Sequence, residues 1–121
     1  MLVNIHTEKV ATLKEGKYHI NIVGGWGITL NGFSMELENL ASFTITIPRR
    51  SFWPVQSFWK GSRAKRVFSF EITESGEYRL TFKNSDKLEV RHSNLRTLMH
   101  RLFAEPVENK NLAILLKRKG L

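Results

Sequence analysis

The sequence predicts an all-β fold, an antiparallel β-sandwich of about eight strands with one short helix near residues 94–104. Three observations predict this class. Apolar and polar residues alternate in most segments, which is typical of strands with one buried face. Turn-forming residues separate these segments at short intervals. The chain has 121 residues, which is the usual size of one domain. It has no cysteine, so its hydrophobic core must stabilise the fold without disulfides.

Residues 1–121 are therefore expected to form a single jelly-roll-like or immunoglobulin-like β-sandwich domain, without a linker or an internal repeat. A β-barrel stays open as the alternative, because barrels use short strands of the same kind. The order of the strands depends on long-range pairing, which local patterns do not determine.

Alternation gives the main strands in chain order. A first strand is predicted near 10–13, and clear alternation marks four more at 18–22, 43–47, 68–73 and 78–83. Each of these four segments is expected to bury one face and to expose the other to water. Proline cannot donate a ladder hydrogen bond, so Pro48 is expected to end the strand that precedes it.

Asn31 and Gly32 form the strongest turn signal in the chain. They lie between apolar segments at 28–30 and 33–37. A type I′ turn needs a positive φ at both central residues, and Asn-Gly meets that need. The sequence therefore predicts a β-hairpin at this position.

Three other segments carry turn residues. Residues 74–76 (Glu-Ser-Gly) predict a second hairpin loop between two alternating strands. Residues 84–86 (Asn-Ser-Asp) predict a turn that leads to a short strand at 88–90, and residues 15–16 (Glu-Gly) predict a turn after the first strand.

One helix and one last strand complete the predicted domain. Apolar residues recur at helical spacing along 95–103, with Ser93 or Asn94 as the N-cap and Pro106 just past the end. The apolar stripe is expected to pack on the sandwich. Residues 112–116 are almost all apolar, which predicts a strand buried on both faces, with a short buried helix as the alternative.

Residues 76–84 read Gly-Glu-Tyr-Arg-Leu-Thr-Phe-Lys-Asn, within the alternating region 67–91. This region covers about a fifth of the chain and resembles the Gly-x-Tyr-x-hydrophobic-x-Phe-x-Asn hairpin of the GOLD-type β-sandwiches. Thr81 stands where a cysteine is common in that family. The resemblance implies a noncatalytic sandwich that binds protein or lipid, and it assigns no functional residue.

The charge of the chain favours an anionic partner. Nineteen Lys and Arg against eleven Asp and Glu give a formal net charge of +8. Such a charge promotes encounter with nucleic acid, acidic lipid, acidic protein or a sulfated or acidic glycan. The first residues lack the pattern of a signal peptide, and no stretch reaches the about 18 apolar residues of a membrane span. A cytoplasmic location is therefore expected.

Residues 49–66 are the most unusual stretch, with six basic residues, no acidic residue and two Phe-Trp pairs. Pro54 and Gly61 predict a loop or a sheet edge here. Basic side chains neutralise phosphate or sulfate groups, and exposed rings stack on bases, press on sugars or enter a lipid interface. The alternative is that the rings are buried and cap the sandwich. The candidate ligand-binding residues are Arg49, Arg50, Trp53, Trp59, Lys60, Arg63, Lys65 and Arg66.

Two further basic groups extend this hypothesis. If they meet the 49–66 segment in space, an anion-binding face results. If they are spread over the surface, the charge is generic. The first group is Lys87, Arg91, His92, Arg96, His100 and Arg101, and the second is Lys117, Arg118 and Lys119.

The sequence holds no recognised catalytic or metal-binding motif. Residues 24–27 (Gly-Gly-Trp-Gly) lack the spacing and the lysine of a phosphate-binding loop, so a tight turn or bulge with Trp26 packed inward is expected. The four histidines lack the spacing of a zinc helix, and His92 and Ser93 point to opposite faces of a strand. We expect no catalysis, no metal and no cofactor.

The predicted function is therefore a noncatalytic interaction domain, which uses the basic and aromatic segment 49–66 to contact an anionic or carbohydrate-bearing partner. Two alternatives stay open: a nucleic-acid-binding or peripheral membrane module, and an assembly protein that forms a homo-oligomer through a strand edge or an apolar patch. Exposed rings at Trp53 and Trp59 would favour binding, and buried rings would remove this site.

Overall fold

The computed structural model describes residues 1–51, 55–91, 109 and 112–119, without the side chain of Arg91. These residues form twelve β-strands and one 3-10 turn, all of the strand pairs antiparallel, which confirms the all-β sandwich. The predicted number of about eight strands is too low, because several strands have only two or three residues and are too short to show alternation. The predicted helix near 94–104 lies outside the described residues.

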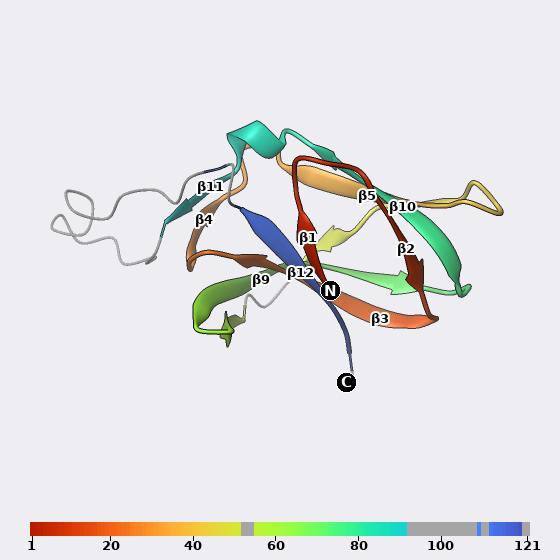
Figure 1. Ribbon diagram of the computed structural model, residues 1–121, viewed down its shortest axis with the longest axis horizontal. Helices are drawn as coiled ribbons and strands as arrows, with labels where there is room; N and C mark the ends of the chain where they lie inside the picture. Colours follow the sequence, from red (N-terminus) through yellow and green to blue (C-terminus); the bar gives the residue numbers. More distant parts are fainter. Residues whose placement is uncertain (52–54, 92–108, 110–111, 120–121) are drawn as a thin grey trace, which may run out of the picture.

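The larger layer of the sandwich is a six-stranded sheet in the order β1-β12-β3-β9-β7, with β8 also paired to β9 (Figure 1). Its strands are β1 (Leu2–Asn4), β3 (Gly16–Val23), β7 (Arg49–Arg50), β8 (Gln56–Trp59), β9 (Ser62–Ile72) and β12 (Ala113–Arg118).

The second layer is a four-stranded sheet in the order β2-β10-β5-β6, and β4 pairs with β11 in a separate two-stranded sheet. Figure 1 shows β5 and β10 above β3 and β9, so the two main sheets face each other. The strands of these two sheets are β2 (Lys9–Leu13), β5 (Ser34–Asn39), β6 (Ile45–Thr46), β10 (Gly76–Lys83), β4 (Gly27–Thr29) and β11 (Glu89–Arg91), and the 3-10 turn η1 spans Ser85–Lys87.

Two of the predicted turns are corners at which the chain passes from one sheet to the other. The turn at 15–16 joins β2 to β3, and residues 73–75 join β9 to β10. The predicted hairpin at 74–76 is therefore wrong in its pairing. The corners lie side by side, because Gly16 pairs with Ile72 and Leu13 pairs with Gly76. Together β2–β3 and β9–β10 form one long antiparallel ribbon, bent so that each half belongs to a different sheet.

The Asn31-Gly32 turn also has the predicted shape and an unpredicted role. Its residues have φ values of 52° and 87°, and the Phe33 N–H donates to the Leu30 carbonyl at 2.9 Å. The flanking strands do not pair with each other, since β4 pairs with β11 and β5 pairs with β10. The hairpin prediction is wrong, because turn chemistry determines the local bend whereas strand partners are chosen by burial in the core.

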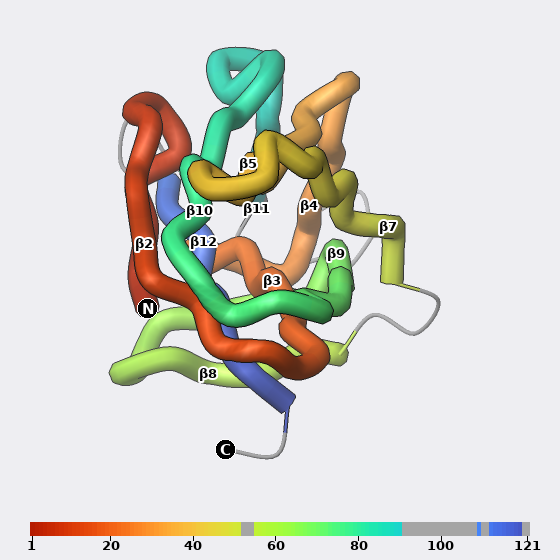
Figure 2. Tube along the Cα trace, turned by 90° about the vertical axis from the view of Figure 1, so that its right-hand side faces the viewer, coloured from red at the N-terminus to blue at the C-terminus, as the bar shows by residue number. Residues whose placement is uncertain are grey.

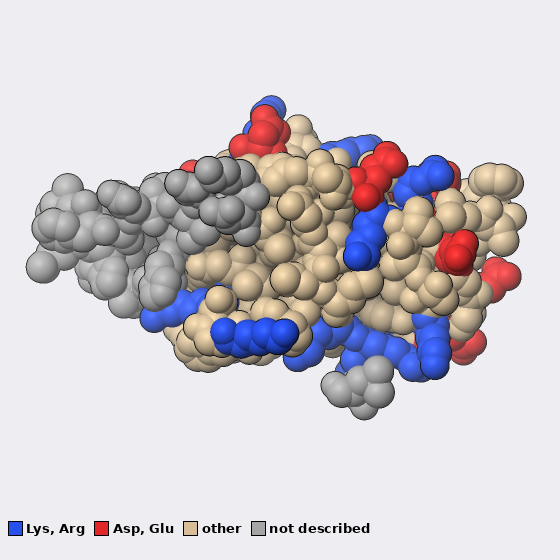
Figure 3. All heavy atoms as spheres, viewed as in Figure 1, with Lys and Arg blue, Asp and Glu red and all other residues tan. Residues whose placement is uncertain are grey.

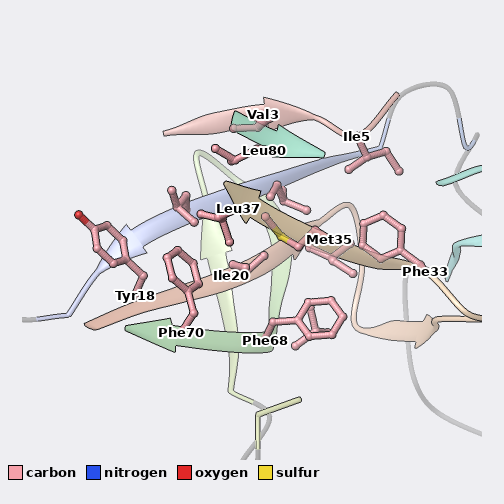
Figure 4. Close-up of a cluster of buried hydrophobic side chains, with 14 of the residues drawn as sticks. Val3, Ile5, Tyr18, Ile20, Phe33, Met35, Leu37, Phe68, Phe70 and Leu80 are labelled. Atoms are coloured by element: carbon pink, nitrogen blue, oxygen red, sulfur yellow. The ribbon is translucent and has the colours of Figure 1, made fainter. Parts of the chain in front are cut away.

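Alternate apolar residues of the two main sheets meet in a continuous core (Figure 4). Ile20 and Ile114 of the six-stranded sheet and Leu37 and Leu80 of the four-stranded sheet have no exposed surface. Tyr18 and Phe70 add a stacked ring pair with centroids 5.1 Å apart. Burial of this apolar surface is the main stabilising term of the domain.

The four-stranded sheet has an exposed apolar edge at β6. The predicted strand at 43–47 forms a ladder only over Ile45–Thr46, and Phe43, Ile45 and Ile47 are 72%, 52% and 64% exposed. The expectation that their alternation buries one face is wrong here, because β6 is the last strand of its sheet. Self-assembly through a strand edge, an alternative predicted from the sequence, would use this strand, and it stays a prediction.

The last strand confirms the burial predicted for 112–116. Ile114 and Leu116 pair with Ile22 and Ile20 of β3 and face the core, while Leu115 faces the outer side of the sheet and is also buried. Strand β12 lies between β1 and β3, and Lys117 alternates with the core-facing Leu116, so the end of β12 carries Lys117 onto the outer face of the six-stranded sheet. Arg118 pairs with Tyr18, and its side chain lies against Gly16.

Candidate functional site

The 49–66 segment, predicted as a loop or a sheet edge, forms strands at the edge of the six-stranded sheet in most of its described part. Arg49 and Arg50 make up β7 and are exposed beside β9, while β8 and the start of β9 form a hairpin. Lys60 and Gly61 close this hairpin with φ values of 46° and 83°. This hairpin turn was not predicted from the sequence, because the residue before Gly61 is a lysine and not the usual Asn or Asp.

The aromatic side chains of this segment lie in different surroundings. Phe58 is 64% exposed and Trp59 is half-buried at the end of β8. The Lys60 ammonium lies 5.2 Å from the centroid of the Trp59 ring. Trp53 lies outside the described residues, so its exposure is untested. One exposed Phe and one half-exposed Trp thus stand at the hairpin tip, beside a lysine.

Trp26 holds the hairpin in place. Its indole Nε1 donates to the Ser57 carbonyl at 3.2 Å, and its ring meets Phe58 edge-on with centroids 5.2 Å apart. The guanidinium carbon of Arg63 lies 4.2 Å from the centroid of the Trp26 ring, and Lys65 Nζ donates to the Trp26 carbonyl at 3.2 Å. Trp26 is half-buried and packs on the hairpin instead of entering the core between the sheets. Arg63 and Lys65 therefore support the hairpin as well as adding charge.

The outer face of the six-stranded sheet carries an open hollow of about 370 Å³. Strand β3 contributes His19 and Asn21 to it, and β9 contributes Arg66. These side chains share one face because Asn21 pairs with Arg66 across a β-bulge that offsets the register of β9. The hairpin bounds the hollow with Val55 and Ser57, and Figure 2 shows β8 beneath β3.

The end of β12 completes the hollow with Lys117, Arg118 and Lys119. Lys117 is the register partner of His19, and the Lys119 N–H donates to the Lys17 carbonyl at 2.7 Å, which extends the pairing past the strand end. The second of the two further basic groups therefore meets the 49–66 segment in space. Four Lys or Arg residues and one histidine line the hollow, and no Asp or Glu of the described part of the chain does so.

Two buried nitrogen atoms in this hollow have no hydrogen-bond partner among the described residues, Nδ1 of His19 and Nε of Arg66. The pKa of His19 is lowered by burial first, and then by the positive charges of Arg66 and Lys119. A buried polar atom without a partner costs free energy. The hollow thus concentrates positive charge and unused hydrogen-bonding capacity in one place.

A second hollow, of about 260 Å³, lies beside the first. Arg50, Lys65 and Arg66 line it together with Ser51, whose buried Oγ has no partner among the residues described by the structure. Arg66 belongs to both hollows. Three of the eight candidate residues therefore converge here, whereas Trp59 and Lys60 stand apart at the hairpin tip.

Carboxylates are used mainly on the opposite layer. Glu36 pairs with Lys83 at 2.9 Å and Glu38 pairs with Arg79 at 3.4 Å, all four on the four-stranded sheet. Figure 3 shows basic side chains along the lower edge of the view, on the side of the six-stranded sheet, with most acidic side chains above and to the right. The net positive charge of the described residues is therefore concentrated on one side.

The first further basic group does not join this surface in its described part. Lys87 lies in η1, which Figure 1 shows on the far side of the molecule from β3. The side chains of its other members, Arg91, His92, Arg96, His100 and Arg101, lie outside the described residues.

His19, Asn21 and Ser57 were not among the site residues predicted from the sequence. His19 and Asn21 alternate with Ile20 and Ile22, so their place on the outer face was readable from the sequence. Their neighbours were not, because β3 meets Arg66 and Lys117 only through long-range pairing.

Among the described residues, no three His, Asp or Glu side chains lie close enough to hold a metal ion. No helix in that part of the chain is both long and apolar enough to cross a bilayer. No protein-family model, curated protein or solved structure matches the chain. The resemblance of region 67–91 to the GOLD-type sandwiches stays a prediction. Its central strand, β10, pairs with β2 and β5 and not with the preceding strand.

Proposed function

We propose that this protein is a noncatalytic domain that binds an anionic partner through the outer face of its six-stranded sheet. The observation that carries the proposal is the hollow of about 370 Å³, lined by four Lys or Arg residues and a histidine and by no carboxylate among the described residues. Arg66 links it to the neighbouring hollow, which Arg50 and Lys65 also line.

The electrostatics of this face support an anion over a neutral ligand. Arg49, Arg50, Arg66, Lys117 and Lys119 have no carboxylate within ion-pair distance among the described residues. Grouped cations repel one another, and a bound anion relieves that repulsion. The exposed Phe58 and half-exposed Trp59 offer rings to a base or a sugar of the same partner.

The dependence of binding on salt tests the proposal. Fluorescence anisotropy of a labelled single-stranded oligonucleotide is expected to show affinity falling steeply with salt, with a log–log slope of roughly −0.7 for each phosphate contacted. Arg66→Gln and Lys117→Gln are each expected to reduce the magnitude of that slope by about 0.7, the value of one phosphate contact. Each is also expected to weaken binding by about fivefold at low salt, since an exposed charge pair contributes up to about 1 kcal/mol.

Lys87→Gln is the matched control, because it removes the same charge from η1 on the far side of the molecule. It is expected to bind as the native protein does. A flat salt response, or an equal loss in the control, would contradict the proposal. A sulfated oligosaccharide and acidic liposomes are measured in parallel, and the tightest of the three probes assigns the class of the partner.

A further inference from the structure

We infer that the hollow between β3, β9 and the end of β12 receives a tetrahedral oxyanion, a phosphoryl or sulfuryl group of the partner, and that His19 takes up a proton when this group binds. The inference rests on the proposed function and names the chemical group recognised at that surface. It adds a residue, His19, and a pH dependence to the site.

The donor set of the hollow suits a tetrahedral oxyanion. Asn21 supplies a neutral donor, Arg66 a guanidinium, and Lys117 and Lys119 two ammonium groups, from three separate segments of the chain. Ser57 also lines the hollow, and its hydroxyl donates to the Ala64 carbonyl at 3.5 Å. Oxyanion oxygens accept several hydrogen bonds each, and charged donors bind them most strongly. The volume of about 370 Å³ is roughly ten times that of one water molecule, so the hollow admits the oxyanion and the ester group that carries it.

The unpaired atoms point to the same ligand. Nδ1 of His19 and Nε of Arg66 are both buried, and neither has a hydrogen-bond partner in the described part of the protein. Both nitrogens carry a proton when the side chains are charged, so both can donate to an oxyanion. An oxyanion between them would supply the missing acceptor to each side chain.

The charges around His19 explain why a proton would follow the anion. Burial and the cations Arg66 and Lys119 lower the pKa of His19, so the ring is neutral near pH 7. An anion in contact with the ring places a negative charge beside it, which favours the charged imidazolium and raises the pKa of His19. The charged groups on this face are Lys17 on β3, Arg66 and the exposed Glu71 on β9, Arg49 on β7, and Lys117 and Lys119 at the end of β12. Arg118 also lines the hollow, with its side chain against Gly16.

Affinity must therefore rise as the pH falls toward the pKa of free His19. Between the pKa of the free protein and the higher pKa of the complex, each binding event takes up a proton. A rise of one unit in the pKa of His19 corresponds to about tenfold tighter binding to the protonated protein. Below the lower of the two pKa values the affinity stops changing.

The experiment uses the native protein and inorganic sulfate, whose charge is constant between about pH 5 and pH 8. The ring signals of His19 are followed by NMR through a pH titration, in chloride and in sulfate at equal ionic strength. We expect sulfate to raise the pKa of His19 and to bind about tenfold more tightly at the acid end of the titration. His19→Gln is expected to bind sulfate independently of pH, and Arg66→Gln to bind it weakly throughout, with Lys87→Gln as the charge-matched control.

The outcomes separate this inference from the proposed function. An unchanged pKa of His19 in saturating sulfate overturns the inference, and so does an absence of sulfate binding when the oligonucleotide or the oligosaccharide still binds. Loss of binding to every anionic probe would overturn both. Phenyl phosphate and phenyl sulfate then distinguish the two groups: the tighter ligand identifies a phosphoryl or a sulfuryl receptor, and binding of neither contradicts the site.

Discussion

The ring of His19 lies on the outer face of the six-stranded sheet, where burial and neighbouring cations act on it in the same direction. Desolvation disfavours the charged imidazolium, and Arg66 and Lys119 disfavour it further. A protonated His19 therefore lowers the stability of the folded protein when no anion is bound. Histidine changes its charge near neutral pH, so this loss of stability depends on pH.

The stability of the protein without an anion is expected to fall as the pH drops below about 6.5, the ordinary pKa of histidine. Above that pH both folded and unfolded states carry a neutral His19, and the residue has no effect. Below it the unfolded chain binds a proton that the folded state resists, and the loss is complete below the folded-state pKa. Urea denaturation at pH 7.5 and pH 5.5 measures the difference, and His19→Gln should lose less stability than the native protein. An equal loss in the variant would contradict the lowered pKa.

At the scale of elements, the alternation of apolar and polar residues predicted where the strands lie but not which strands pair with each other. The segments 18–22 and 78–83 lie within β3 and β10 as predicted, and 68–73 lies within β9 except for its last residue. The turns near residues 15 and 75 were recognised as turns, but not as corners between sheets. Alternation and turn residues act over a few positions, whereas sheet membership depends on which apolar faces meet in the core.

The β8–β9 hairpin is expected to depend on Trp26, which supports it with a hydrogen bond, an edge-on ring contact and a cation–π contact. Trp26→Leu removes all three and keeps an apolar side chain. Ring and cation–π contacts contribute about 1 kcal/mol each. Hydrogen exchange in the hairpin, at amides such as that of Arg66, is therefore expected to accelerate by about tenfold or more, since local opening limits exchange.

Amides of β10 serve as the internal control for that measurement, because β10 lies in the other sheet and makes none of these contacts. Equal acceleration in β10 would show global destabilisation instead of a loosened hairpin. Unchanged exchange in both strands would contradict the role of Trp26.

At the scale of the whole molecule, the basic charge is divided unequally between the two layers. The four-stranded sheet pairs its cations Lys83 and Arg79 with carboxylates, and the six-stranded sheet gathers cations around two hollows, the larger of them on its outer face. The sequence predicted the anionic partner from the net charge and identified Arg50, Lys65 and Arg66 by their unusual stretch. It could not place His19 beside Arg66 or Lys117 beside His19, because those neighbours come from strands far apart in the chain.

The central claim is that an anionic partner binds the outer face of the six-stranded sheet. Amide chemical-shift mapping with a short sulfated or phosphorylated oligomer tests it most directly, at a salt concentration low enough for binding. Binding is expected to perturb the amides at 17–21, 63–69 and 115–119 and to leave those of β2 and β5 unchanged. Perturbations confined to the four-stranded sheet would contradict binding at the outer face of the six-stranded sheet. So would an absence of perturbations at a concentration of oligomer that binds other basic proteins.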